Sequence, residues 1–194
     1  MSVFVTSDTH FGHKNILRFN PKTRPWADVT EMDDALVDIW NRRVNHDDIV
    51  YHLGDVSMCG FERTMEIINR LNGRIVLVRG NHDQIFRKEQ NIKKAMASGK
   101  IIEITDHKEL RINRETIVLN HYAMRVWNKS HHGSFQLFGH SHGSLIGIGR
   151  QVDVGIDSSE LESGGGPFAL ETVLDFLRQK TVQFLDHHNE DTNP

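Results

Sequence analysis

The sequence predicts an α/β or α+β sandwich. Short apolar runs alternate with segments of helical periodicity, and several runs are β-branched and apolar on consecutive residues, as in strands covered on both faces. The 194 residues are 38% hydrophobic and 25% charged, which is ordinary for a globular protein with a sizeable core. We expect residues 1–186 to form a single domain and residues 187–194 to form a polar C-terminal tail.

Nine apolar runs predict strands. In chain order, the expected strands are Val3–Thr6, Ile49–Leu53, Arg74–Val78, Ile101–Ile104, Glu109–Ile112, Thr116–Leu119, Phe135–Phe138, Gln151–Val154 and Thr181–Leu185. The fifth and sixth are joined through Asn113-Arg114-Glu115, a pattern typical of a hairpin.

Three segments have the periodicity of amphipathic helices, namely Glu31–Val44, Glu62–Leu71 and Ala169–Gln179. Thr30 with Asp33 resembles a capping box at the start of the first, and Asn72-Gly73 ends the second. The apolar stripes of these helices predict burial in the core.

Composition excludes some classes of function. A formal net charge of -3 gives no support for strong non-specific binding of nucleic acid, which needs a basic surface. No apolar run is long enough to span a membrane, and residues 1–5 lack the order of a signal peptide. The single cysteine cannot form an internal disulfide, so we expect a cytoplasmic protein.

Five short polar blocks carry the chemistry. They are Asp8-Thr9-His10, Gly54-Asp55, Gly80-Asn81-His82-Asp83, Asn120-His121 and Gly139-His140-Ser141-His142. Most follow an expected strand, so their side chains should meet at one edge of a sheet. Carboxylate, amide and imidazole ligands without a thiolate suit Mn, Fe, Zn or Ni. Each block alone could be a turn or a surface loop, but all five in order indicate a metal site.

The five blocks together resemble the signature of the calcineurin-like metallophosphoesterase superfamily, over residues 8–142. The opening residues 7–13 resemble a small bacterial and phage-type branch of predicted phosphoesterases. The resemblance implies a four-layer sandwich, with two mixed β-sheets packed face to face and flanking helices.

The resemblance also implies two divalent transition-metal ions, with Mn²⁺ favoured and Fe, Ni or Zn as alternatives. The ligands implied for one ion are Asp8, His10, Asp55 and His142, and those for the other are Asp55, Asn81, His121 and His140. Asp55 would bridge the two ions. His82 would act as a catalytic group that stabilises charge or protonates the leaving oxygen, and Asp83 would orient it.

The implied reaction is hydrolysis of a phosphate ester, with a phosphodiester favoured, by in-line attack of a metal-bridging hydroxide. The alternatives are a phosphomonoesterase acting on nucleotides or phosphoproteins and a binding scaffold without catalysis. His13 and Arg125 are candidate substrate contacts, and Arg18 and Arg24 offer further guanidinium groups for phosphate oxygens. The substrate could be a nucleotide or a nucleic-acid end. The sequence leaves the physiological substrate, the native metal and the oligomeric state open.

Overall fold

The structure is a computed structural model that describes residues 1–185, so the expected tail at 187–194 lies outside the described residues. Within that range the chain forms two β-sheets. The strands are β1 (Val3–Thr6), β2 (Ile49–His52), β3 (Arg74–Val78), β4 (Ile101–Thr105), β5 (Lys108–Ile112), β6 (Glu115–Leu119), β7 (Phe135–Phe138), β8 (Gln151–Asp153) and β9 (Phe168–Ala169).

Both sheets are mixed. The first has the order β4-β3-β2-β1-β9, in which β1 to β4 run parallel and β9 runs antiparallel to β1. The second has the order β5-β6-β7-β8, with the predicted hairpin β5-β6 at one edge. In the first sheet Thr6 pairs with His52, and His52 pairs with Leu77. The parallel strands therefore end side by side, at the edge where the polar blocks begin.

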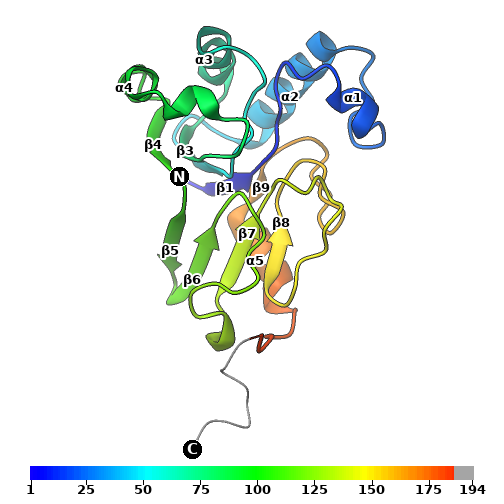
Figure 1. Cartoon of the computed structure of the whole chain (residues 1–194), viewed down its shortest axis with the longest axis vertical. Coiled ribbons are helices and arrows are strands. Elements are labelled where there is room, and N and C mark those ends of the chain that lie inside the picture. Colours follow the sequence, from blue (N-terminus) through cyan, green and yellow to red (C-terminus); the bar gives the residue numbers. More distant parts are fainter. Residues whose placement is uncertain (186–194) are drawn as a thin grey trace, which may run out of the picture.

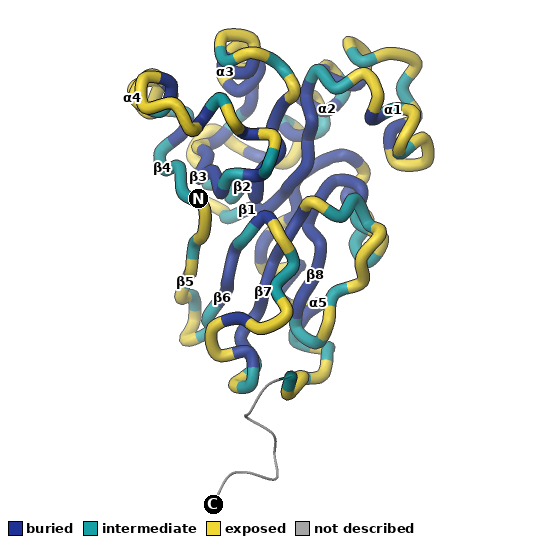
Figure 2. Tube along the Cα trace, in the orientation of Figure 1, coloured by how far each residue is buried: buried dark blue, intermediate teal, exposed yellow. Residues whose placement is uncertain are grey.

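Helices and sheets enclose two hydrophobic cores (Figure 1). The helices are α1 (Ile16–Phe19), α2 (Val29–Arg43), α3 (Phe61–Arg70), α4 (Glu89–Ala97) and α5 (Leu170–Arg178). One core joins the first sheet to α2, α3 and α4 and includes Trp40 and Leu77. The other core joins both sheets to α5 and includes Val5, Leu137 and Leu174. Most strands are buried, whereas β5 alternates between partly buried and exposed residues (Figure 2), and the predicted sandwich of two mixed sheets is confirmed.

Helix α2 begins earlier than the sequence pattern indicates. Its N-cap is Asp28, whose side chain accepts hydrogen bonds from the backbone N–H groups of Thr30 and Glu31, at 2.8 and 2.9 Å. The predicted Thr30–Asp33 capping box is therefore wrong, because Thr30 already lies inside the first turn. Asp33 is buried and accepts from the backbone N–H of Gly12 at 2.9 Å, which ties α2 to the loop after β1.

The predicted strand Thr181–Leu185 is also wrong, since these residues form no strand. The neighbouring edge of the second sheet is β8, which has only three residues. On it, the backbone carbonyl of Gln151 accepts from Lys180 Nζ at 3.0 Å. The Lys180 side chain thus occupies a backbone acceptor of β8 that a further strand would need for pairing. The short β9, which pairs with β1 instead, was not predicted.

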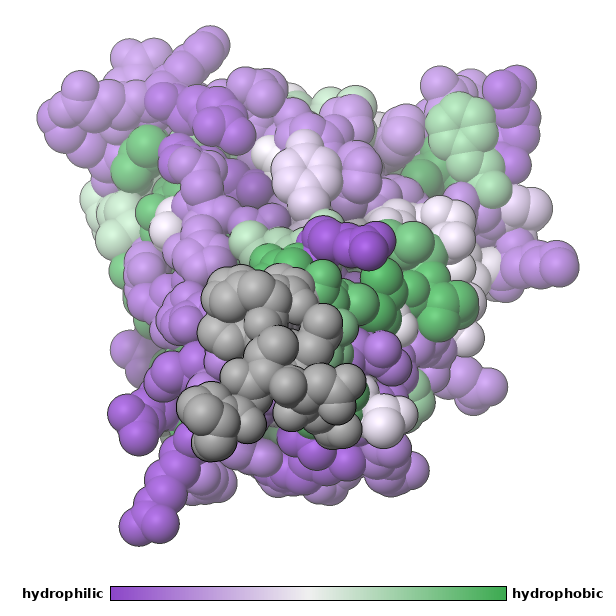
Figure 3. Space-filling model, turned by 60° about the horizontal axis from the view of Figure 1, so that its bottom comes forward, coloured by the Kyte–Doolittle hydropathy of each residue, from purple (hydrophilic) through white to green (hydrophobic). Residues whose placement is uncertain are grey.

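The surface of the described residues is mainly polar. On the face drawn in Figure 3, polar groups predominate and apolar areas lie between them. Exposed apolar side chains include Leu145, Ile146 and Ile148, in the loop before β8. Within residues 1–185, none of the helices has both the length and the apolar character needed to cross a membrane.

Candidate metal centre

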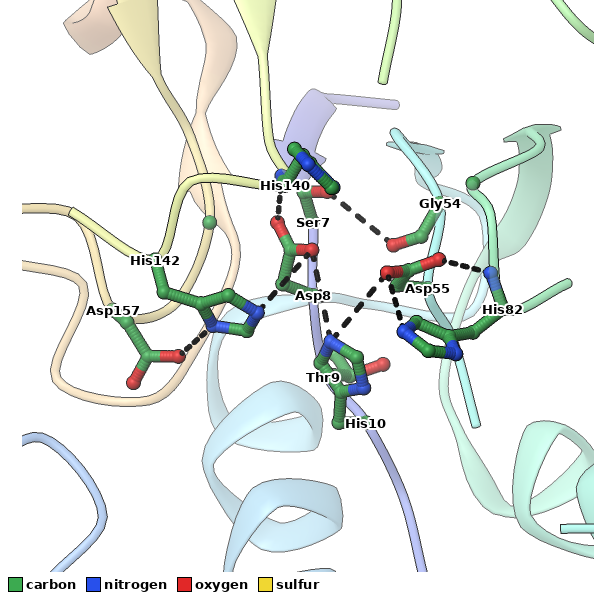
Figure 4. A network of polar contacts seen from close by, with 12 residues as sticks. Ser7, Asp8, Thr9, His10, Gly54, Asp55, His82, His140, His142 and Asp157 are labelled. Atoms are coloured by element: carbon green, nitrogen blue, oxygen red, sulfur yellow. Dashed lines mark hydrogen bonds and ion pairs between the residues drawn. The ribbon is translucent and has the colours of Figure 1, made fainter. Parts of the chain in front are cut away.

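The five polar blocks converge at the strand ends of both sheets. Loops after β1, β2 and β3 of the first sheet meet loops after β6 and β7 of the second. Figure 4 shows Asp8 and Asp55 facing one another with the imidazole rings around them. Segments more than one hundred residues apart in the sequence thus supply one cluster of potential ligands.

Backbone strain is concentrated in this cluster. Eight non-glycine residues of the described chain have positive φ, a conformation that costs of order 1–3 kcal/mol outside glycine. Five of them belong to the polar blocks, namely Asp8, His10, Asp55, His140 and His142. The sharp turns that these angles produce direct the ligand side chains back over the ends of the strands. Most of the positive-φ non-glycine residues therefore lie in the loops that carry the potential ligands.

At two positions in the blocks only glycine fits, because a carboxylate oxygen lies too close for a side chain. A Cβ atom on Gly80 would lie 2.2 Å from Asp55 Oδ1, and one on Gly139 would lie 2.4 Å from Asp8 Oδ2. Both distances are far below contact. The glycines allow these loops to pack against the two carboxylates.

One group of potential ligands consists of Asp8, His10 and His142, whose donor atoms all lie within 4.8 Å of one another. His10 Nε2 lies 3.8 Å from Asp8 Oδ1, and His142 Nε2 lies 4.0 Å from the same oxygen. Asp8 Oδ1 and His10 Nε2 are buried and have no hydrogen-bond partner in the described part of the chain. Because unpaired buried polar atoms are costly, these two atoms fit a site that a cation completes.

The second group consists of Asp55, His121 and His140, with donor atoms inside the same 4.8 Å limit. His121 Nδ1 donates to the backbone carbonyl of Leu53 at 2.7 Å, so in its neutral form, the form that binds metal, the ring carries its lone pair on Nε2. That lone pair faces Asn81 Oδ1 at 3.1 Å and Asp55 Oδ2 at 3.5 Å. Three acceptors directed at one point fit a bound cation.

Asp55 lies between the two groups. Its Oδ1 accepts from the backbone N–H of His82 at 2.8 Å. Its Oδ2 lies 3.6 Å from His10 Nε2 of the first group and 3.5 Å from His121 Nε2 of the second. One carboxylate oxygen is therefore fixed by the backbone, while the other is available to both groups.

Burial and neighbouring groups shift the pKa values of three potential ligands, two of the first group and one of the second. Desolvation raises the pKa of Asp8 to about 7 and lowers the pKa of His10 to about 2. Burial also acts to raise the pKa of Asp55, but His121 and the backbone N–H of His82 outweigh it and lower that pKa to about 2. A neutral imidazole and an ionised Asp55 are the forms that bind metal.

His82 and His13 lie beside the ligands but belong to neither group. The side chain of His82 is 41% exposed, and its Nε2 lies 3.9 Å from Asp55 Oδ2. The ring of His13 lies 5.3 Å from that of His10, and its buried Nδ1 has no hydrogen-bond partner. The His82 residue is exposed and His13 is partly exposed, so both are more accessible than the buried His10.

Asp83 does not hold the His82 ring, contrary to our expectation. Its buried carboxylate accepts from the backbone N–H groups of Asp55 and Gly80, each at 2.8 Å, and of Val56 at 3.1 Å. Both oxygens are thereby directed to backbone donors. Asp83 joins the loops after β2 and β3 and so fixes the backbone on either side of the second ligand group.

The family-model comparison matches residues 1–153 to the calcineurin-like phosphoesterase superfamily domain. The chain belongs to this superfamily. A relative from Methanocaldococcus jannaschii, described as uncharacterized, is 42% identical over 88 residues, which are 44% of this chain and 49% of that protein. The chain thus spans about half the length of that relative.

Two further similarities extend over most of the chain. The Gene 66 protein of Mycobacterium phage D29 is 27% identical over 182 residues, covering 81% of this chain and 88% of the phage protein. A solved structure from Aquifex aeolicus, described as a protein of unknown function, covers 90% of this chain and 98% of its own, with a TM-score of 0.68 and 22% identity. The latter shows a shared fold.

Two of the arginines predicted to bind phosphate differ in their exposure in this calcineurin-like domain, since Arg24 is buried and Arg125 is exposed. Arg125 is exposed, and within residues 1–185 no hydrogen bond or ion pair ties it to the ligand groups. Arg24 is buried against Asp157, with Nη2 and Oδ2 2.8 Å apart. It is therefore not exposed to a substrate.

Sequence reasoning missed two carboxylates behind the first ligand group. Asp153 accepts from the backbone N–H groups of Gly143 and Gly155, and Asp157 accepts from His142 Nδ1. Both lie at or just after β8. Their position at a strand end, like that of the other blocks, was the signal that could have revealed them.

Proposed function

We propose that the chain is a metal-dependent phosphoesterase that binds two divalent ions, Mn²⁺ being favoured, and hydrolyses phosphodiesters. The observation that carries the proposal is the position of Asp55 Oδ2, which lies within 3.6 Å of an imidazole nitrogen from each ligand group. A carboxylate placed in this way suits a pair of neighbouring ions. Two ions held together are typical of enzymes that act on phosphate esters.

The residues present fit such ions. The donors are carboxylate, amide and imidazole groups, and buried Asp8 Oδ1 and His10 Nε2 have no hydrogen-bond partner among residues 1–185. We assign Asp8, His10 and His142 to one ion and Asn81, His121 and His140 to the other, with Asp55 shared. When bound, the ions supply Lewis-acid polarisation of the phosphate and activation of the attacking water.

The chain itself supplies the remaining functions. We assign His82 to hydrogen bonding with the phosphate or to protonation of the leaving oxygen, because its ring is exposed beside Asp55 and is not tied to a protein partner by a hydrogen bond. His13 is placed to contact a substituent on the side of His10. Asp83 acts indirectly, since it fixes the backbone of Asp55 and Gly80.

A diester is favoured because the centre is open on the side of His82 and His140, which are both exposed. Tyr122 is 48% exposed, and its ring lies 4.7 Å from that of His140. This ring offers a stacking surface for an aromatic substituent, such as the base of a nucleotide or a nucleic-acid end. Arg125, which is exposed, stays a candidate contact for the substrate.

The test is a metal-resupply assay. Protein stripped with a chelator is given Mn²⁺, Ni²⁺, Zn²⁺ or Mg²⁺, and hydrolysis of a chromogenic phosphodiester is compared with that of the matching monoester. We expect turnover of the diester to exceed that of the monoester and to depend on added metal. Faster turnover of the monoester would favour a phosphatase. No turnover of either ester with any metal contradicts the enzyme assignment and favours a scaffold.

His82→Ala separates catalysis from metal binding. We expect the variant to bind as much metal as the wild type and to lose roughly 10²- to 10⁴-fold in rate, as for a missing general acid. Metal content is measured by elemental analysis alongside kcat. Loss of an ion from this variant would show that His82 is a ligand.

A further inference from the structure

A buried polar network lies directly behind His142. His142 Nδ1 donates to Asp157 Oδ2 at 2.8 Å, while Nε2 of the same ring points to Asp8 Oδ1, 4.0 Å away. Figure 4 shows the ring between the two carboxylates. Because a carboxylate only accepts hydrogen bonds, Nδ1 carries a proton, and the lone pair of the neutral ring lies on Nε2, toward the ligand group.

Arg24 holds Asp157 in this position. Its Nε donates to Asp157 Oδ1 at 3.1 Å and its Nη2 to Oδ2 at 2.8 Å, so the guanidinium grips the carboxylate with two parallel bonds. Thr23 Oγ1 also donates to Oδ1. The Arg24 and Asp157 side chains are 0% and 1% exposed. The geometry of Asp157 is therefore closely constrained.

The same guanidinium reaches the first polar block. Nη2 donates to the backbone carbonyl of Asp8 at 2.6 Å, and Nη1 donates to that of Thr9 at 3.0 Å. These carbonyls belong to the turn in which Asp8 and His10 have positive φ. Arg24 thus links the backbone of two ligands, Asp8 and His10, to the carboxylate that holds the third, His142.

Stability alone is a weak reason for this pair. Burying an arginine and an aspartate has a large desolvation cost, and well-packed apolar residues often stabilise a fold as well or better. A carboxylate that accepts from the distal nitrogen of a ligand histidine fixes the ring and makes its other nitrogen a better donor to metal. The network is positioned to serve that purpose at His142.

We propose that Asp157, held by Arg24, is a positioning residue that fixes His142 with Nδ1 protonated and Nε2 directed to the first metal ion. The inference rests on the proposed function, because it takes His142 as a ligand. Asp157 lies beyond residues 1–153, the part matched to the superfamily. The phosphoesterase centre of this chain therefore draws support from its C-terminal segment.

The first experiment uses the wild-type protein and needs no variant. In protein loaded with Zn²⁺ at pH 8, ¹⁵N-histidine NMR should show a slowly exchanging proton on Nδ1 of His142. The peak is assigned by its loss in His142→Gln. A proton on Nε2 instead of Nδ1 overturns the proposal.

The second experiment compares Asp157→Asn with Asp153→Asn. Asp153 is a matched control, because it is a buried carboxylate that holds the same loops through backbone N–H groups and, within the residues that the structure describes, has no hydrogen bond to a ligand side chain. We expect Asp157→Asn to weaken binding of one Mn²⁺ by about 10- to 100-fold in calorimetric titration, the usual range for such partners. Asp153→Asn should change either affinity by less than threefold.

The outcomes separate the two proposals. Binding of fewer than two ions by the wild-type protein would contradict the proposed function. The NMR experiment would still report the His142 tautomer, provided that zinc occupies the first group. If the wild type binds two ions and Asp157→Asn binds them with unchanged affinities, the positioning role of Asp157 is wrong and the proposed function stands. Equal weakening in both variants also overturns the positioning role, because a general loosening of the loops would then explain the effect. If Asp157→Asn fails to fold, the wild-type spectrum still decides.

Discussion

The two ligand groups differ in what supports them from behind. In the first, His142 donates to a charged carboxylate, Asp157, which a buried arginine holds in place. In the second, His121 donates to a neutral backbone carbonyl, that of Leu53. His140 of the second group is exposed, whereas Asp8 and His10 of the first are 0% and 2% exposed.

This difference indicates how the two halves divide their tasks. The first group has two buried members and the partly exposed His142, which a charged network supports, so it should hold an ion tightly. The second group also has two buried members, but His140 completes it at the surface, where a substrate and water arrive. We therefore expect the second ion to exchange more readily and to interact more directly with the substrate.

The largest effect should come from the residue that both groups share. Asp55→Asn removes the charge of the oxygen that faces both His10 and His121. We expect the loss of one or both ions and a fall in kcat of at least roughly 10²- to 10³-fold. Metal content after dialysis and initial rates measure the two effects. Full occupancy by two ions in this variant would contradict the bridging role.

A pair of variants tests the asymmetry directly. His10→Ala should abolish binding at the first group, because the buried site cannot be completed by bulk water. His140→Ala should weaken the second site by about 10- to 100-fold, with activity partly restored by excess Mn²⁺, since water can replace an exposed ligand. Titration of chelated protein with Mn²⁺ measures both. If excess metal rescues the two variants equally, the proposed difference between the groups is wrong.

Asp83→Ala tests the backbone support of the second group. Three backbone N–H groups would lose their acceptor, so we expect the free energy of unfolding of the metal-free protein to fall by about 2–4 kcal/mol. Urea denaturation measures the change. A variant as stable as the wild type, but with weaker metal binding, would show that Asp83 acts on the ligands and not on the fold.

The smallest effect is expected away from both groups. Asp48 accepts from the backbone N–H groups of Ser2 and Asn45, at 2.6 and 2.8 Å, and these bonds lower its pKa in the folded state. A carboxyl with a lowered folded pKa stabilises the fold above its unfolded value, near 3.8, and loses this effect as pH falls through the folded value.

Asp48→Asn should therefore lower stability by less than about 1 kcal/mol at pH 7 and leave metal binding unchanged. The difference from wild type should shrink as pH falls below 3.8. Thermal unfolding across pH measures it. A difference that grows on acidification would mean that another group is responsible.

Much of the fold followed from local pattern. The parallel strands of the first sheet and the β5-β6 hairpin carry continuous apolar runs, and all were located to within one residue at either end. The two-residue β9, the four-residue α1 and the nine-residue α4 were missed. The first two are too short to carry a period. The run Thr181–Leu185 has the composition of a strand, but it does not pair with the edge strand β8, where Lys180 Nζ takes the carbonyl of Gln151.

The sequence by itself determined the chemistry of the centre. Carboxylate, amide and imidazole groups in five ordered blocks indicated a metal site at strand ends, and the superfamily match agrees with that interpretation. Only the tertiary structure decided which groups support the ligands. Asp83 binds backbone and not His82, and Arg24 holds Asp157 and not phosphate. The reason is physical: ligand types are local properties of residues, whereas hydrogen-bond partners depend on which distant loops the packed sheets bring together.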